Sequence, residues 1–187
     1  SGSALSPHYQ CYLAALNILD AKMFMLNERV RDWMDPTQPA QKGTEGHHLF
    51  PRKYQEKVLG TRDFKRINQA ANFAPTDWAT NIKISDRAPA DYWPELVAQR
   101  SQDENWLSQQ MYWHALPKGW ENMTYEEFLE QRRSLIAEVI RDAFGQISDG
   151  SGVHSEPMPE VEIPGGRSLQ EFIEAGLLKE DDLLDPV

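Results

Sequence analysis

The chain has 187 residues, of which 40 % are hydrophobic and 26 % charged, so it can bury one domain-sized core and is not disordered throughout. No apolar run approaches the roughly 18 residues that a membrane span needs, and the single cysteine, Cys11, excludes an internal disulfide and a zinc site of paired Cys-x-x-Cys motifs. We therefore expect a soluble, cytoplasmic protein with no membrane contact. The formal net charge of −10 argues, as an average, against a nucleic-acid partner, because Lys and Arg neutralise phosphates.

The first third of the chain predicts helix, loop and a short extended segment. Apolar residues recur at helical spacing over 9–33, which predicts one or two amphipathic helices that end at Asp35-Pro36. Residues 36–46 have the composition of a loop, and 45–51 are extended in character. Pro51 can open the next helix as its first residue, and Gly60 can end it.

Three further helices are predicted downstream. A cap at Thr76 begins a short helix that carries Trp78, a residue expected in the core. One longer helix is expected over roughly 92–112. A capping-box signature, Thr124 with Glu127 three residues later, begins a helix of over twenty residues that reaches about 147.

The composition also suggests how the chain is divided. Residues 1–3 carry no targeting signal and are expected to be a cloning remnant. Residues 4–147 hold the apolar patterns of the main domain. The Ser-, Gly- and Pro-rich residues 148–166 predict a linker, and 167–187 predict a short helical tail with too few apolar residues to fold alone.

The negative net charge hides a basic segment. Residues 41–87 hold nine basic and five acidic side chains, a balance of +4, so the rest of the chain carries −14. Such a segment is typical of a surface that binds a polyanion, and it is equally compatible with a solvated surface paired to acidic neighbours.

Two adjacent histidines, His47 and His48, are the candidate chemical groups. Adjacent residues of a strand point to opposite faces, so the two rings cannot serve one purpose in the same way. One could bind a metal ion while the other acts as a base, since the imidazole pKa near 6.5 suits a base at neutral pH. The simpler interpretation is a surface pair with no role. His114, among aromatic residues, is expected to be a packed histidine.

Further motifs give the histidine pair a context. The chain reads His47-His48-Leu49-Phe50-Pro51, then Ala71-Asn72-Phe73, then Thr80-Asn81 and a later Pro89. In these residues it resembles the HNH, or His-Me finger, endonucleases, and especially the C-terminal nuclease domain of GmrSD-type modification-dependent restriction proteins, with the SspE type of phage-defence protein as one candidate. The specific motifs cover about 45 residues and the weaker similarity roughly 140. The resemblance implies a mainly helical α+β fold with a ββα-metal unit at about 44–88.

The resemblance also implies roles for four residues. His48 would be the general base, and Asn72 would orient its ring. His47 and Asn81 would hold a divalent metal ion, with Mg²⁺ as the first expectation and Mn²⁺ as the alternative. Because His47 stands where a carboxylate is commoner, this ligand pair carries no negative charge, and metal binding should depend on phosphate oxygens of the substrate.

The expected substrate is double-stranded DNA, cut by metal-dependent phosphodiester hydrolysis, with nicking before any double-strand break. The candidate phosphate contacts are Arg52, Lys53, Lys57, Arg62, Lys65, Arg66 and Lys83. The resemblance further implies a role in anti-phage defence, an N-terminal NTPase-like domain in the full-length protein and, as an option, a homodimer. A non-catalytic DNA-binding or partner-docking module and an RNA-directed nuclease remain the alternatives.

Overall fold

The computed structural model describes residues 6–34 and 45–149, all within the first of two units of the chain, residues 1–153. Within those ranges the chain forms eight α-helices, two short 3-10 helices and two strands. The helices are α1 (Pro7–Ile18), α2 (Val30–Met34), α3 (Arg52–Lys57), α4 (Phe64–Ile67), α5 (Trp78–Ile84), α6 (Pro89–Arg100), α7 (Glu104–Trp113) and α8 (Tyr125–Ser148), with 3-10 helices η1 (Ala70–Asn72) and η2 (Trp120–Asn122). The fold is therefore α+β and mainly helical, as the sequence predicts.

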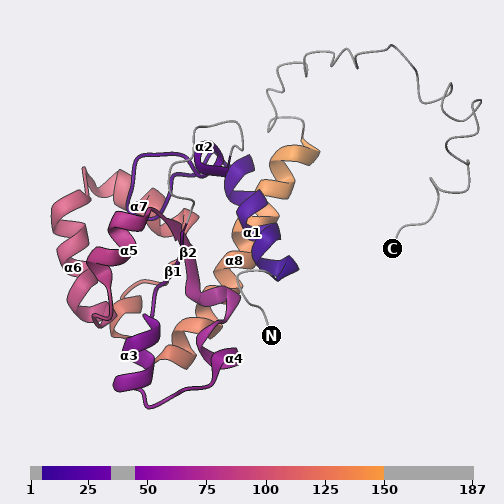
Figure 1. The fold of residues 1–187 in the computed structure, drawn as a ribbon. Helices are drawn as coiled ribbons and strands as arrows, with labels where there is room; N and C mark the ends of the chain where they lie inside the picture. The colour runs from indigo at the N-terminus through magenta and orange to yellow at the C-terminus, as the bar shows by residue number, and fades with distance from the viewer. Residues whose placement is uncertain (1–5, 35–44, 150–187) are drawn as a thin grey trace, which may run out of the picture. The chain divides into compact units, whose positions relative to one another are not determined.

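The two strands, β1 (Glu45–His48) and β2 (Phe73–Thr76), form a small antiparallel sheet. Its register places His47 opposite Ala74 and His48 opposite Phe73. Helix α5 begins directly after β2 and packs against β1. Figure 1 shows this sheet between α5, α6 and α7 on one side and α1 and α8 on the other, with α3 and α4 at the lower end.

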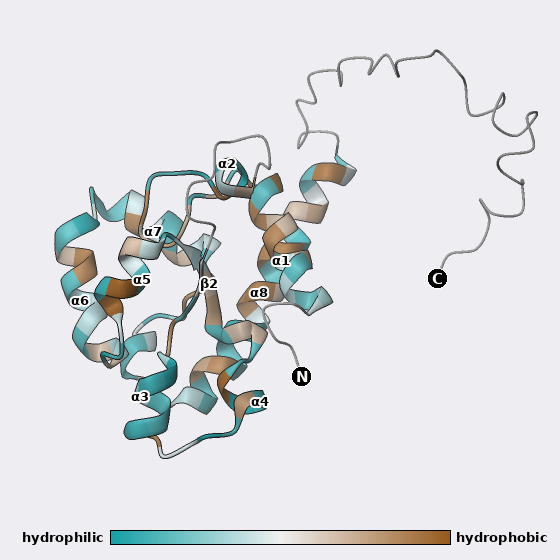
Figure 2. Cartoon of the chain, in the orientation of Figure 1, coloured by the Kyte–Doolittle hydropathy of each residue, from teal (hydrophilic) through white to brown (hydrophobic). Residues whose placement is uncertain are grey.

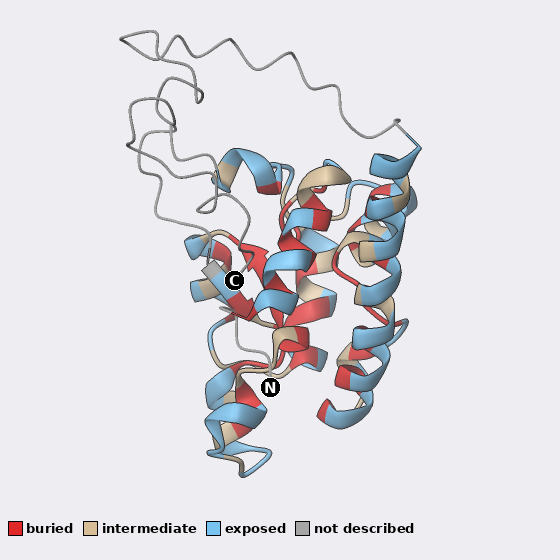
Figure 3. Cartoon of the chain, turned by 90° about the vertical axis from the view of Figure 1, so that its right-hand side faces the viewer, coloured by how far each residue is buried: buried red, intermediate tan, exposed pale blue. Residues whose placement is uncertain are grey.

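Two apolar clusters enclose the sheet. One packs Leu49 and Phe50 against the aromatic residues of α6, η2 and α8, and the other packs α1 against the C-terminal half of α8. Phe73 belongs to the second cluster and its neighbour Ala74 to the first, since successive strand residues point to opposite faces. Figure 3 shows the buried residues on the inward faces of the helices and along the strands.

Helix α8 confirms the strongest local signal of the sequence. It has 24 residues, and the Thr124 hydroxyl accepts from the Glu127 backbone N–H while the Glu127 carboxylate accepts from the Thr124 N–H. Both bonds satisfy N-terminal groups that a helix leaves unpaired. The reciprocal cap explains why the start was predictable to the residue.

Two other helix predictions need correction. The single helix expected over 92–112 is two helices, because Ser101 is extended and the Asp103 side chain accepts from the Trp106 N–H to begin α7. The expectation of one or two helices over 9–33 is met by α1 and the short α2, which are joined by an irregular segment. The cap of α5 is Asp77, whose carboxylate accepts from the Thr80 N–H.

No helix of the described part of the chain is long and apolar enough to cross a membrane. The predicted tail over 167–187, the remnant at 1–3 and all of the linker except Ser148 and Asp149 lie outside the described residues. Ser148 is the last residue of α8, and Asp149 caps that helix.

Candidate active site

His47 lies in the middle of the fold and is 1 % exposed. Its Nδ1 is 2.9 Å from Oδ1 of Asn81, and its ring stacks on Phe24 and meets Tyr92 edge-on. Burial lowers the pKa of His47 to about 4, although the hydrogen bond with Asn81 raises it. The ring is therefore neutral near pH 7. Because an amide oxygen only accepts, Nδ1 carries the proton in this arrangement, and a metal ion between His47 and Asn81 would require the other tautomer, with the proton on the buried Nε2.

His48 points to the opposite face of the strand, as its position next to His47 predicts. Its ring packs on Phe73, and its Nε2 is 2.9 Å from Oδ1 of Asn68. Burial lowers the pKa of His48, the bond with Asn68 raises it, and the nearby Arg52 lowers it. Because an amide oxygen only accepts, Nε2 carries the proton and Nδ1 is left as the basic nitrogen.

Asn72, the residue expected to orient His48, has a different contact set. Its Oδ1 accepts from the Phe50 N–H, and its Nδ2 donates to the carbonyls of Phe50 and Ile67. The side chain is fully buried in η1, just before β2. The orienting contact predicted for Asn72 is made by Asn68, and Asn72 ties together the segments that follow β1 and precede β2.

Asn68 is the residue that the sequence analysis missed. It caps the C-terminal end of the four-residue α4, where the chain turns toward η1. Its only sequence signal is its place four residues before Asn72, inside the same short apolar patch. That spacing does not show which of the two amides will face the histidine.

Asn81 is the fourth residue of α5, the short helix that the sequence predicts after Thr76. The Asp77 cap and the packing of α5 on β1 bring its side-chain oxygen to His47. Trp78, three residues earlier, was expected in the core, but it is 45 % exposed. The prediction for Trp78 is wrong because α5 is a surface helix that buries only Thr80 and Ile84.

An open cavity of about 330 Å³ brings most of these groups together. It is lined by His47, His48, Pro51, Arg52, Lys53, Asn81, Ile82 and Ser85. Ser85, which ends α5, has a φ of 54°, a left-handed conformation that is uncommon for a residue other than glycine. Three of the four predicted site residues thus line one cavity with two cations.

The other candidate phosphate contacts are spread over the surface. Lys57 pairs with Asp86 at 2.7 Å, Arg66 with Glu126, and Lys83 donates to Gln99. Arg52 also pairs with Glu56, at 2.7 Å. Within the described ranges, Lys53, Arg62 and Lys65 form no ion pair. Lys65 and Arg66 line a separate cavity between α4 and α8.

The donor set could hold a divalent ion only weakly, because the ion would have to displace the hydrogen bond between His47 Nδ1 and Asn81 Oδ1. Nδ1 of His47 and Oδ1 of Asn81 face each other at the cavity wall, and imidazole nitrogen suits Mn²⁺ better than Mg²⁺. Among residues 6–34 and 45–149 no group of three or more His, Cys, Asp or Glu side chains could hold a metal ion. A metal ion here would need further ligands from water or substrate.

His114 confirms the expectation of a packed histidine. It is fully buried, its Nε2 donates to the Lys22 carbonyl at 3.1 Å, and its ring meets Phe24 edge-on. Burial and, to a smaller extent, the neighbouring Arg132 lower its pKa to about 3. It has no access to the cavity of His48.

Comparison of the chain with known protein families, with curated proteins and with solved structures found no match.

Proposed function

We propose that this protein is a metal-dependent DNA endonuclease whose active site is the cavity between β1, α3 and α5. The observation that carries the proposal is the pairing of two histidines with two different amides, His47 with Asn81 and His48 with Asn68, at a cavity that also holds Arg52 and Lys53. A base, a pair of metal ligands and two phosphate contacts are the groups that phosphodiester hydrolysis needs. The resemblance to His-Me finger nucleases assigns β1, β2 and α5 as the ββα-metal unit.

His48 is the general base in this proposal. Nδ1 accepts a proton from the attacking water while the water oxygen forms a bond to phosphorus, the bond from phosphorus to the 3′ oxygen breaks, and the leaving oxygen takes a proton from solvent. Asn68 is the positioning residue, because its oxygen holds the proton on Nε2 and so keeps Nδ1 unprotonated.

His47 and Asn81 would hold the divalent ion. When bound, such an ion stabilises the negative charge on the phosphate and on the leaving oxygen. Since the pair supplies no negative charge, the ion should bind tightly only together with a phosphate, and Mn²⁺ should support cleavage at least as well as Mg²⁺.

Double-stranded DNA is the proposed substrate, bound through phosphates by Arg52 and Lys53 at the cavity. The proposal extends to anti-phage restriction in the cytoplasm, with an N-terminal NTPase-like domain in the full-length protein and the option of a homodimer. These parts depend on the resemblance to GmrSD-type proteins, including the SspE type, and on nothing else.

A second candidate, a non-catalytic DNA-binding or partner-docking module, is favoured by one observation. The bond between His47 and Asn81 already satisfies both atoms that would hold the metal ion, so the pair can also serve the fold alone. Titration of the protein with Mn²⁺ in the presence of a short DNA duplex separates the two. No metal binding would favour the docking module.

The direct test is a time course of supercoiled plasmid with the full chain, with Mg²⁺, with Mn²⁺ and with neither. Nicked circles should accumulate first and linear DNA later, because one site makes one cut. The rate should fall steeply with salt, since phosphate contacts dominate. A matched RNA substrate distinguishes an RNA-directed nuclease. Cleavage that persists in His48→Ala at the full rate would refute the proposed site.

A further inference from the structure

The end of the molecule formed by α3, the turn after it and α4 exposes three large apolar side chains within seven residues. Val58 is 65 % exposed, Leu59 42 % and Phe64 57 %. Scattered apolar residues are ordinary on a protein surface, but a group with a polar rim marks an interaction site. We call Val58, Leu59 and Phe64 the apolar tip.

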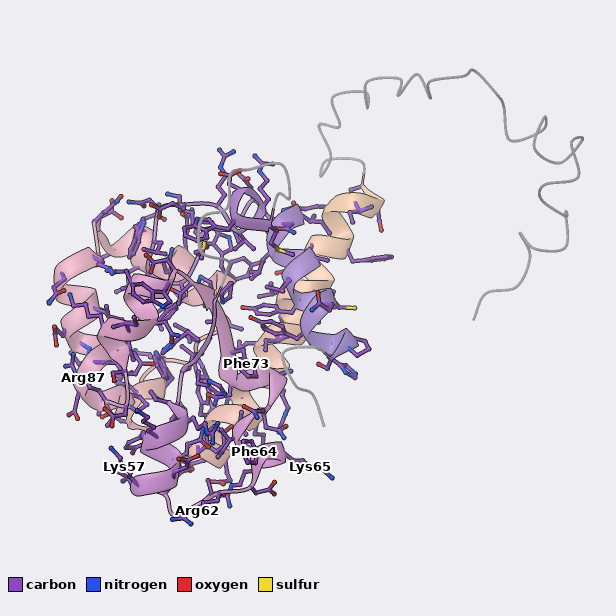
Figure 4. The ribbon with its side chains drawn as sticks, viewed as in Figure 1. Lys57, Arg62, Phe64, Lys65, Phe73 and Arg87 are labelled. Carbon is purple, nitrogen blue, oxygen red and sulfur yellow. The ribbon has the colours of Figure 1, made fainter. Side chains whose placement is uncertain are left out.

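Cations surround the apolar tip. Figure 4 shows Lys57, Arg62 and Lys65 at the same end of the molecule as Phe64, while Arg87 lies on another side. Between residues 52 and 66 there are six basic and two acidic side chains, in a chain whose net charge is −10. Figure 2 shows α3 as hydrophilic along its length. An apolar group within a basic surface is complementary to a nucleic acid, which carries negative phosphates and has apolar base faces.

Local hydrogen bonds hold the tip in place. Gly60 has a φ of +68°, and the Thr61 N–H donates to the Gln55 carbonyl at 3.2 Å, which closes the turn after α3. Asp63 caps α4 by accepting from the Lys65 N–H at 2.9 Å. The Arg52 guanidinium lies 4.6 Å above the Phe64 ring. Arg52 also lines the cavity, so the tip and the cavity share a side chain.

We propose that the apolar tip inserts between base pairs from the minor groove of duplex DNA while Arg62 and Lys65 bind the flanking phosphates. The inference rests on the proposed function, because it assigns the DNA that the cavity would cut. Helices α3 and α4 have six and four residues, or about 9 and 6 Å, too short to read the major groove. Single side chains fit the minor groove of about 6 Å, where apolar wedges kink DNA.

Arg52 links the kink to the cavity, because it lines the cavity and its guanidinium lies over the ring of Phe64 in the apolar tip. Pyrimidine–purine steps unstack most easily. Cleavage should therefore favour phosphodiester bonds close to a TA or CA step, although no side chain reads a base.

Insertion can be measured apart from cleavage. The test uses the full chain carrying His48→Ala, in EDTA, with a short duplex that has 2-aminopurine beside a TA step and a dye at one end. Binding should raise 2-aminopurine fluorescence, because the base loses its stacking partner. Val58→Ser with Phe64→Ser should abolish that rise and weaken binding about tenfold, or roughly 1.4 kcal/mol.

The matched control is Phe144→Ser. Phe144 is 68 % exposed on α8, 18 residues and so about 27 Å along that helix from Glu126, the partner of Arg66. Phe144→Ser should change neither the 2-aminopurine fluorescence nor the affinity for DNA. Tight binding without a fluorescence rise would overturn the inference, and so would a rise that persists in the Val58→Ser, Phe64→Ser variant. An affinity for DNA that this variant leaves unchanged would also overturn it, and would favour a tip that docks another protein.

The same measurements separate the two proposals. If the fluorescence rise depends on the tip but the unsubstituted chain cuts no DNA with any metal ion, the nuclease proposal is refuted and the insertion of the tip into DNA still stands. Cleavage at full rate by the Val58→Ser, Phe64→Ser variant, with no preference for TA or CA steps, would refute the wedge and leave the nuclease.

Discussion

Two polar clusters meet the sheet, and they differ in what their side chains bind. In the buried cluster, Asn72 and Arg132 bind almost only backbone groups. In the cavity cluster, His47 and His48 each bind the side chain of one asparagine. A side chain whose donors and acceptors all bind backbone has nothing left to offer a substrate, whereas His48, which binds Asn68 through Nε2, keeps Nδ1 open. The partners thus distinguish a structural polar group from a candidate catalytic one.

Arg132 illustrates the structural kind. It is fully buried on α8, and its guanidinium donates to the carbonyls of His114, Ala71 and Phe73 at 3.1, 2.7 and 2.9 Å. Within the described residues it forms no ion pair with a carboxylate. A buried charge is tolerated only when its hydrogen bonds are satisfied. Here two of the three carbonyls come from the residues around the start of β2, and the third comes from the residue after α7.

The largest expected effect is in the cavity cluster. His48→Ala should lower the cleavage rate 10²–10⁴-fold, about 3–5 kcal/mol, because the attacking water loses its base, while DNA affinity and the free energy of unfolding change little. Single-turnover cleavage measures the rate, and urea unfolding of the same preparation measures the free energy of unfolding. Equal losses in stability and rate would place His48 with the structural cluster.

The counterpart is Arg132→Leu, which should destabilise the fold by about 3–5 kcal/mol because three buried carbonyls lose their donor. The control is the neighbouring Arg133→Leu, since the side chain of Arg133 is exposed and donates to the side chain of Gln69. It should cost less than about 1 kcal/mol. Urea unfolding gives both values, and similar values for the two variants would contradict the account of the buried cluster.

The third effect depends on pH and falls on His114. Its folded-state pKa of about 3 lies below the unfolded value near 6.5, so the fold favours the neutral ring. Stability should be complete above pH 6.5 and fall as pH drops toward 3, because the unfolded chain takes up the proton first. The loss should reach about 3 kcal/mol by pH 4. His114→Gln should make the curve of unfolding free energy against pH flatter, and an unchanged slope would contradict the assignment.

The two asparagines should separate stability from activity. Asn72→Ala should destabilise the fold by about 2 kcal/mol, because the Phe50 N–H and two carbonyls lose their partners. Asn68→Ala should lower the cleavage rate about tenfold with a small change in melting temperature, since a freely rotating imidazole still samples the productive orientation. Asn68→Asp should restore orientation and shift the pH–rate profile upward, a change that a purely structural role would not produce.

The smallest effect is expected from a chelator. EDTA should stop cleavage yet leave the melting temperature within a degree or two, because α1 and α8 supply the apolar clusters and only two side chains face the proposed metal ion. Differential scanning calorimetry with and without EDTA measures this. A large drop would make the ion part of the fold.

Much of this architecture is determined by short stretches of sequence. Thr124 with Glu127 specifies the start of α8, and the residues from Thr76 onward predict the short helix that carries Asn81. The adjacency of His47 and His48 on a strand was enough to predict rings on opposite faces. These features depend on hydrogen bonds and geometry within a few residues, which the local sequence contains.

Only the tertiary structure decided which polar groups meet. Asn68 rather than Asn72 faces His48, and Arg132 reaches carbonyls about 60 residues away in sequence. Trp78 is exposed because α5 turns a different face to the core than its apolar pattern suggested. Asparagine, arginine and tryptophan can each serve inside or outside a fold, and their partners come from segments distant in the chain. Sequence periodicity predicts which faces of an element are apolar. It does not predict which backbone group or side chain, distant in the sequence, will bind a polar side chain when those faces pack.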